Sequence, residues 1–225
     1  MKIKNYILHL YSLLPHSIRM FIGVKKRICG GSCNKITIKA HHCRNVRVNV
    51  FGSNNEVLIE EGCVLQNLNI SINGNGNVLC LNKNVEFIGG GEISLSNNNT
   101  KISINENSKF FWGGHKLETA EDSSEIIIGK DCLISNDVSM KTSDYHGIFD
   151  ASTGERLNKA RSIYIGDKVW LAPFVTVLKG TTIKNDSVVG THSVVAKAFD
   201  EPNVVIAGNP ARIVKHNIFW KKELE

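Results

Sequence analysis

Apolar residues recur at intervals of six along the last third of the chain. From Ile165 onward an aliphatic residue opens each block of six, and a small or β-branched residue often stands at the fifth position. The opening residues are Ile165, Leu171, Val177, Ile183, Val189 and Val195. A period of six fits neither an α-helix, which repeats every 3.6 residues, nor a hairpin meander. The pattern predicts a triangular all-β solenoid, in which each block forms a short strand and a turn and three blocks complete one coil.

A looser form of the same repeat runs from Lys35 to Ile134. Its coils are anchored by aliphatic residues at Ile38, Ile59, Leu81, Ile104 and Ile128. By subtraction these positions are 21, 22, 23 and 24 residues apart, so the coils are longer than the 3 × 6 = 18 residues of the regular region. The additional residues are rich in Asn and Gly, which tolerate the left-handed backbone of sharp corners. We therefore expect the solenoid to extend through this region, with Asn side chains stacked between coils.

The repeat is interrupted between Ile128 and Ile165, which are 37 residues apart by subtraction. Regular blocks continue at Ile134 and Met140 and then lapse over residues 143–161. This segment predicts a loop that leaves the solenoid and returns at Ile163. Long loops on a rigid scaffold are where binding and catalytic groups tend to lie.

The N-terminal residues show a different pattern. Apolar residues between Ile3 and Val24 recur at helical spacing, with an interruption at Pro15, and the basic run Lys25–Arg27 follows. This segment is interpreted either as a helix that covers the open end of the solenoid or as a basic amphipathic segment at the inner face of a membrane. We expect the former, because the apolar end of a solenoid needs covering. The expected organisation is an N-terminal helical cap over 1–34, a β-helix over 35–215 and a C-terminal tail over 216–225.

Charge and hydropathy exclude several classes of function. The chain has 27 Lys and Arg against 21 Asp and Glu, a net charge of +6, without an arginine-rich run or a basic patch interleaved with aromatic residues. Nucleic-acid binding is therefore not expected, whereas an anionic small molecule or a lipid phosphate suits this charge. The N-terminal apolar stretch contains His9, His16 and Arg19, and no stretch reaches the roughly 20 apolar residues of a membrane span. We expect a cytoplasmic protein.

The cysteines and histidines do not show the spacing of a metal site. None of the six cysteines forms a CxxC pair, and Cys63 and Cys132 stand at the fifth position of their blocks, where a small side chain packs inside the coil. We expect buried, reduced thiols. The histidines that we considered as zinc ligands do not recur in a common register, and no metal is expected. They are His41, His42, His115 and His192.

Three parts of the chain together resemble a known family. They are the blocks from Ile165 to Asp200, the closing stretch from Val204 to Lys215, and the loop histidine His146. They resemble the hexapeptide-repeat acyltransferases, which include galactoside and maltose O-acetyltransferases and bacterial surface-polysaccharide O-acetyltransferases. The resemblance is specific over residues 128–215. It implies a left-handed parallel β-helix, a homotrimer and acetyl-CoA as the acetyl donor.

The resemblance also suggests which branch of the family is nearest. The loop sequence Ser143–His146 looks closest to the polysaccharide branch, and Gly147 stands where the sugar branch usually has a proline. By this resemblance His146 is the general base, since a neutral imidazole can take the proton of an attacking hydroxyl. Asp144 would support the imidazole ring. Transfer would be direct, within a ternary complex, without an acyl-enzyme.

The other expected site residues follow from the same resemblance. Trp170, Tyr145 and Asn158 would contact the acceptor. The pantetheine arm of CoA would meet short side chains, and its phosphates would meet basic ones. The short side chains are Ala172, Thr191 and Ala196, and the basic residues are Lys197, Arg212 and Lys215. Ala198 follows Lys197 where the family often has an Asp.

The leading interpretation is an acetyl-CoA-dependent O-acetyltransferase that acts on a bacterial surface polysaccharide or its precursor. N-acetylation of a nucleotide-linked amino sugar is an alternative, and serine O-acetylation is a weaker one. A different class of interpretation is a solenoid without catalytic activity that serves as a binding or structural module. The His146 loop and the closure Asn209–Arg212 favour an enzyme, because a purely structural solenoid needs neither.

Overall fold

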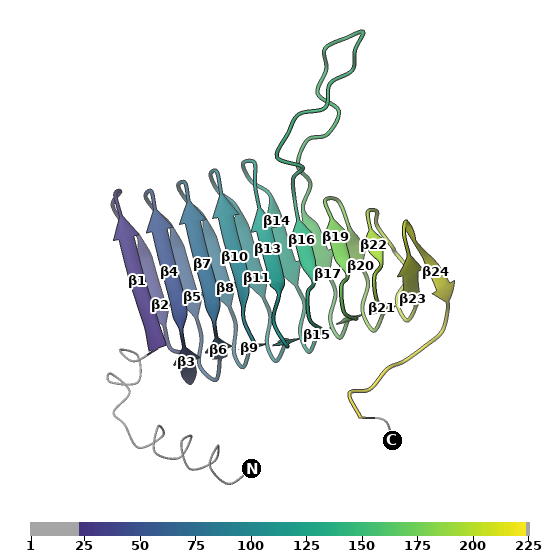
Figure 1. Ribbon diagram of the computed structural model, residues 1–225, viewed down its shortest axis with the longest axis horizontal. Coiled ribbons are helices and arrows are strands. Elements are labelled where there is room, and N and C mark those ends of the chain that lie inside the picture. Colours follow the sequence, from purple (N-terminus) through teal and green to yellow (C-terminus); the bar gives the residue numbers. More distant parts are fainter. Residues whose placement is uncertain (1–22, 224–225) are drawn as a thin grey trace.

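The computed structural model describes residues 23–223 and shows a parallel β-solenoid with three flat sides (Figure 1). Successive strands pass from one side to the next, so that, as far as β22, each sheet is built from every third strand. The all-β solenoid expected from the six-residue period is confirmed, and its strands are parallel as the family resemblance implies. The expected helical cap lies mainly within residues 1–22, outside the described residues.

The first side, sheet A, has eight strands, and its first strand is β1. β1 pairs in parallel with β4, from Val24 opposite Val46 to Cys29 opposite Phe51. The expected boundary at residue 35 is therefore wrong, because the solenoid already includes Val24. The strands are β1 (Val24–Cys29), β4 (Val46–Phe51), β7 (Leu68–Asn73), β10 (Gly91–Ser96), β13 (His115–Thr119), β16 (Ser139–Lys141), β19 (Thr176–Leu178) and β22 (Val194–Val195).

The second side, sheet B, holds the aliphatic residues that anchored the looser repeat. Ile38, Ile59, Leu81, Ile104 and Ile128 lie opposite one another on successive strands. The predicted anchor positions are thus one continuous ladder. The strands are β2 (Lys35–Ile38), β5 (Glu56–Ile59), β8 (Val78–Leu81), β11 (Lys101–Ile104), β14 (Glu125–Ile128), β17 (Ile163–Ile165) and β20 (Thr182–Ile183).

The third side, sheet C, ends in a hairpin at the C-terminal end of the solenoid. All its pairs are parallel except the last, in which β24 turns back on β23. The strands are β3 (His42–Arg44), β6 (Val64–Gln66), β9 (Glu86–Ile88), β12 (Lys109–Phe111), β15 (Leu133–Ile134), β18 (Trp170–Leu171), β21 (Val188–Val189), β23 (Val205–Gly208) and β24 (Ala211–Lys215).

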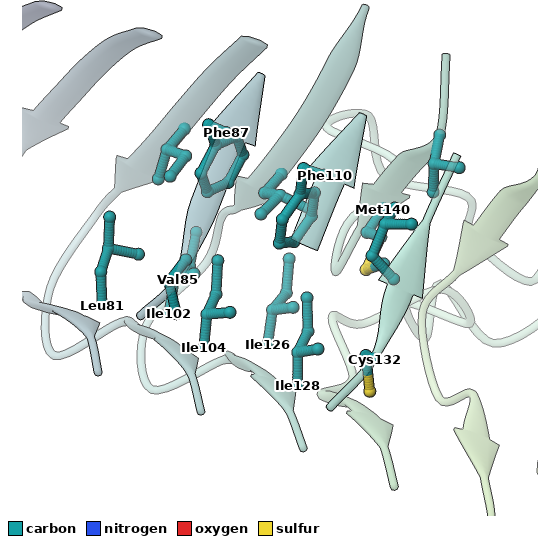
Figure 2. Close-up of a cluster of buried hydrophobic side chains, with 14 of the residues drawn as sticks. Leu81, Val85, Phe87, Ile102, Ile104, Phe110, Ile126, Ile128, Cys132 and Met140 are labelled. Atoms are coloured by element: carbon teal, nitrogen blue, oxygen red, sulfur yellow. The ribbon is translucent and has the colours of Figure 1, made fainter. Parts of the chain in front are cut away.

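One core runs through the solenoid, because alternate residues of every strand point inward. Figure 2 shows its middle section, where Leu81, Ile104 and Ile128 stack beside Phe87 and Phe110. The two phenylalanine rings are stacked, with their centroids 4.1 Å apart and an angle of 8° between their planes. Each fully buried aliphatic side chain contributes roughly 1.5–3 kcal/mol relative to an exposed one. Coil-on-coil stacking of such residues therefore holds the loop-bearing coils in register.

The corners use asparagine in the two ways that the sequence suggests. Asn45 and Asn67 have positive φ angles of 53° and 52° at equivalent corners, and the side chain of Asn45 donates to that of Asn67 at 3.0 Å. Inside the corner between sheets A and B, the side chains of Asn55 and Asn77 each accept a backbone N–H from the next coil. Asn77 also accepts the Thr100 hydroxyl at 2.8 Å. The expected Asn ladders are confirmed.

The cysteines are free thiols. Burial raises the pKa of Cys63 and of Cys132 to about 11, so both remain protonated at neutral pH. Over residues 23–223, no cluster of three or more His, Cys, Asp and Glu side chains could hold a metal ion. In the same range, none of the helices is both long enough and apolar enough to cross a membrane.

Candidate active site

The expected loop leaves the solenoid after β16 and returns at β17, at the corner between sheets A and B (Figure 1). The scaffold on both sides keeps its register, since Met140 lies opposite Val177 and Ile126 lies opposite Ile163. The return at Ile163 is as the sequence predicts. The loop projects from an undistorted frame.

The outer half of the loop is a hairpin. Ile148 accepts a backbone hydrogen bond from Leu157 at 2.8 Å, and Asp150 donates to Glu155 at 2.9 Å. The Asp150 carboxylate accepts the backbone N–H groups of the two residues at the tip, and the hydroxyl and amide hydrogen bonds there lower its pKa to about 2. The loop is therefore held by its own hydrogen bonds.

Asn158 clamps the inner half of the loop. Its side chain is 9% exposed, and its amide donates to the Asp144 carboxylate at 2.7 Å and to the His146 carbonyl at 2.8 Å. Its side-chain oxygen accepts the Ile148 N–H at 2.7 Å. We expected Asn158 to contact the acceptor, whereas in this structure these groups all bond within the loop.

The Asp144 carboxylate bonds to Lys179 and Asn158 and forms no hydrogen bond with the His146 ring in the described residues. Its carboxylate accepts from Lys179 Nζ at 2.5 Å as well as from Asn158, and these bonds hold its pKa below the usual range. In the described part of the chain, no hydrogen bond joins Asp144 to the His146 imidazole, which is exposed and has no hydrogen-bond partner. The expected support of the ring by Asp144 remains a prediction, and the described residues show its carboxylate bonded to Asn158 and Lys179. Asp144 instead joins the loop to Lys179, which follows β19.

A second connection between the loop and the solenoid, which the sequence analysis did not predict, is formed by Arg156. Arg156 forms a two-pronged ion pair with Glu121, at 2.7 and 2.8 Å, and Ser143 Oγ donates to the same carboxylate at 2.6 Å. Glu121 belongs to the corner after β13, so the pair crosses from the preceding coil to the loop. Nothing in the polar run around Glu121 distinguishes it from other corner residues, because its partner is 35 residues away.

Tyr145 lies beside a cavity of about 310 Å³ at the base of the loop. Its backbone has a φ of 63°, its side chain is half exposed, and partial burial raises its pKa. Two of its lining residues, Tyr145 and Gly147, flank His146 in the sequence. This position is compatible with the expected role of Tyr145 in acceptor binding. The residues lining it are Asn97, Ala120, Glu121, Ser143, Tyr145, Gly147, Phe149 and Arg156.

Trp170 lies on a different side of the solenoid from the loop. It is in β18 of sheet C, its indole N–H donates to Ser135 Oγ at 3.2 Å, and its ring centroid is 6.0 Å from that of Trp220. Trp220 donates to the Lys168 carbonyl at 2.8 Å and is buried, so the C-terminal tail is fixed against this face. The sequence analysis did not predict that Trp220 packs beside Trp170. Within residues 23–223, no hydrogen bond or ring contact joins the Trp170 side chain to His146.

The residues expected to bind CoA are brought together only in part. Lys197 and Arg212 line one open hollow of about 680 Å³ near the C-terminal end, together with Asp200 and Glu201. Ala196 and Lys215 are exposed nearby in sequence, outside that lining. Ala172 is buried, and Thr191 is exposed with its hydroxyl donating to the Pro173 carbonyl at 2.8 Å. Of the three basic residues expected at the phosphates, Lys197 and Arg212 therefore share one hollow.

Comparison with known proteins identifies the family. Residues 162–197 match the family described as bacterial transferase hexapeptide (six repeats). The chain is 37% identical over 195 residues to the polysialic acid O-acetyltransferase of Neisseria meningitidis, across 86% of this chain and 88% of that protein. It is 36% identical over 110 residues to the polysialic acid O-acetyltransferase of Escherichia coli O1:K1, across 48% of this chain and 35% of that one.

Solved structures agree with this assignment. The polysialic acid O-acetyltransferase OatWY superposes with a TM-score of 0.77 and 33% identity, covering 90% of this chain and 92% of that chain. The polysialic-acid-specific acetyltransferase NeuO superposes with a TM-score of 0.78 and 29% identity, covering 90% and 91%. The family expected from the six-residue blocks is confirmed: the chain belongs to the hexapeptide-repeat acetyltransferases, in the group that contains the polysialic acid O-acetyltransferases.

Proposed function

We propose that this protein transfers an acetyl group from acetyl-CoA to a hydroxyl of a bacterial surface polysaccharide or of its precursor. One observation carries the proposal: the likeness to a polysialic acid O-acetyltransferase extends over 86% of this chain and 88% of that enzyme, and so includes the loop with His146. The acceptor is a polyhydroxylated glycan chain. A cytoplasmic location is part of the proposal, because acetyl-CoA is available there.

His146 serves as the general base. Its exposed ring has no hydrogen-bond partner among the described residues, so a ring nitrogen is free to receive a proton. The acceptor hydroxyl gives its proton to the imidazole and attacks the thioester carbonyl carbon, which forms a tetrahedral oxyanion. Collapse of this intermediate breaks the carbon–sulfur bond, and the proton passes from His146 to the departing CoA thiolate. The products are an O-acetyl ester and free CoA.

Asp144 and Asn158 serve this chemistry by holding the loop backbone. Asn158 bonds the His146 carbonyl, and the ion pair between Asp144 and Lys179 joins the loop to the coil that follows it. These contacts fix the backbone at His146 while leaving its ring free. Orientation of a base relative to its substrate is worth a large part of a catalytic barrier.

The proposal includes a homotrimer in which one copy completes the site of another. Trp170 lies on sheet C and His146 lies on the loop between sheets A and B, so a site that uses both requires two copies. The loop also exposes apolar side chains, which a neighbouring copy would cover. These are Ile148, Phe149 and Leu157, which are 57%, 59% and 62% exposed.

Mixing experiments test this arrangement. His146→Ala and Trp170→Ala proteins, each of low activity, are dissociated, mixed and reassociated. If the two residues come from different copies, mixed trimers contain sites with both residues intact, and part of the activity returns. Failure to recover activity in trimers shown to be mixed by mass spectrometry would rule out a shared site.

CoA would lie with its phosphates near Lys197, Arg212 and Lys215. Lys197 and Arg212 already line one hollow, where a compact and a forked cation suit phosphate oxygens. The pantetheine arm would then run past the short side chains toward the loop of the adjacent copy. These side chains are Ala172, Thr191 and Ala196.

The decisive assay combines the purified protein, acetyl-CoA and capsular polysaccharides, including polysialic acid. We expect release of free thiol and an acetylated polymer whose acetyl groups are removed by mild alkali, as O-esters are. His146→Ala should lower kcat roughly 10²–10⁴-fold, the usual worth of a general base. Alkali-stable product would indicate an amide and N-acetylation instead. An undiminished kcat in His146→Ala would exclude this residue as the base.

A further inference from the structure

Glu121 lies outside the loop, yet its side chain is directed at the loop and at nothing else in the described structure. Its carboxylate accepts both terminal nitrogens of Arg156 and the hydroxyl of Ser143. A planar guanidinium held at both nitrogens by a carboxylate has a fixed orientation, unlike a single lysine contact. The Glu121 and Arg156 side chains are each 29% exposed, so the pair is partly shielded from water.

The backbone of Glu121 is itself fixed by the solenoid. It has a φ of 67°, in the left-handed region that non-glycine residues rarely adopt, and its N–H donates to the side-chain oxygen of Asn97 at 3.1 Å. Asn97 belongs to the preceding coil. Two stacked coils therefore fix the backbone from which the Glu121 carboxylate extends to the loop.

From Arg156 the contacts continue to the backbone around His146. Arg156 Nε donates to the side-chain oxygen of Asn158 at 3.4 Å, and Asn158 donates to the His146 carbonyl. On the other side of the carboxylate, Ser143 Oγ also accepts the Tyr145 N–H at 3.0 Å. The Glu121 carboxylate is therefore connected to the residues that precede His146, through Ser143, and to those that follow it, through Arg156.

We infer that Glu121 is a positioning residue for acetyl transfer, which sets the place of His146 through Arg156 and Ser143. This inference rests on the proposed function, in which His146 is the base. Hydrogen bonding from Arg156 holds the pKa of Glu121 below its usual range, so the carboxylate is charged at neutral pH. Loss of the charge should leave CoA binding intact and misplace the base.

Glu121→Gln tests this role, with Glu86→Gln as the matched control. Glu86 pairs with Lys109 at 2.6 Å across two neighbouring coils, with similar exposure, and forms no hydrogen bond or ion pair with the loop among the described residues. We expect Glu121→Gln to lower kcat roughly 10- to 100-fold, since small displacements of a catalytic group have effects of that size. The KM for acetyl-CoA should stay unchanged. Glu86→Gln should show an equal change in melting temperature with an unchanged kcat.

Arg156 supplies a second and independent test. Arg156→Lys keeps the charge but loses the fork, so its kcat should fall between those of the wild type and Arg156→Gln. If Glu121 acts through Arg156, the double variant Glu121→Gln/Arg156→Gln should lose no more activity than the worse single variant. Multiplied losses in the double variant, or a Glu121→Gln kcat equal to that of Glu86→Gln, would overturn the inference.

The two proposals fail in distinguishable ways. Full activity in His146→Ala would contradict the proposed function, whatever Glu121 does. An inactive His146→Ala together with a fully active Glu121→Gln would contradict only the positioning role. Acceptor binding without turnover, measured by calorimetry on both variants, should be retained in each if both residues act on the chemical step.

Discussion

A histidine buried in the core should make this protein sensitive to acid. His115 in β13 is 1% exposed, and its ring packs edge-on against Phe110, with the centroids 5.2 Å apart and an angle of 84° between the planes. Burial lowers its pKa to about 4, and this outweighs the opposing effects of the Phe111 backbone and Asp137. The imidazole is therefore neutral in the folded protein at pH values where it is protonated in the unfolded chain.

The size of the effect follows from the two pKa values. The unfolded pKa is 6.5 and the folded one about 4, and each unit of difference is worth about 1.36 kcal/mol. Because the pKa of His115 is lower in the folded protein than in the unfolded chain, the free energy of unfolding is undiminished by this residue above pH 6.5. It decreases as the pH falls from 6.5 toward 4, where protonation favours the unfolded chain. Relative to pH 7, the free energy of unfolding should be lower by about 2 kcal/mol at pH 5 from this residue alone.

His115→Leu replaces the titrating imidazole with an apolar side chain of similar size. Urea unfolding at pH 7 and pH 5, at one protein concentration, should show a loss in the wild type that is about 2 kcal/mol larger than in His115→Leu. His41→Leu, at an exposed position, should lose as much as the wild type. Equal pH dependence in the wild type and His115→Leu would refute the argument.

Three further predictions concern other buried groups. Asn158→Ala removes the bonds to Asp144 and the His146 carbonyl, so kcat should fall roughly 10- to 100-fold; an unchanged kcat in a steady-state assay would show that the loop does not need the clamp. Asn77→Ala leaves buried partners unsatisfied at about 1–3 kcal/mol each, measurable by urea unfolding, whereas the exposed Asn73→Ala should cost little. The buried Cys63 thiol, with its pKa raised to about 11, should resist alkylation at pH 8 until the protein is unfolded, and rapid labelling of native protein would contradict its burial.

The fold could be predicted from the sequence because a solenoid repeats its own contacts. Ile59 meets Ile38 and Leu81 for the same reason that each is aliphatic: all three occupy one position of successive coils. A one-dimensional repeat therefore specifies three-dimensional neighbours. The pattern failed at Val24–Cys29, where four of six residues are exposed and Lys26 occupies a position that is buried in the next coil. The end coil lacks a neighbour on one side, so its inward positions carry no apolar signal.

The site was less predictable, because its contacts are not repeats. The sequence located the loop and His146, since both follow from a break in the pattern and a resemblance. It assigned Asp144 to the imidazole on proximity in the chain, whereas the carboxylate reaches Lys179, 35 residues away. The pair between Glu121 and Arg156 spans the same separation. Partners of this kind depend on how a loop folds back on its scaffold, which no periodicity records.

The place where the loop leaves the solenoid has a physical reason. Along the corner between sheets A and B, buried polar side chains bond from coil to coil, from Asn55 to Asn77 and Thr100. Three coils after Asn77, the Thr142 hydroxyl accepts the Ala120 N–H at 3.0 Å and lies 2.9 Å from the Ser124 hydroxyl. Thr142 is fully buried, and the loop begins at the next residue. Because buried hydrogen bonds reach the residue before the loop, the base of the loop is tied to the core, and the contacts from Glu121 and Lys179 fix its inner half. The histidine that we propose as the general base can thus be carried on an exposed loop whose backbone is fixed.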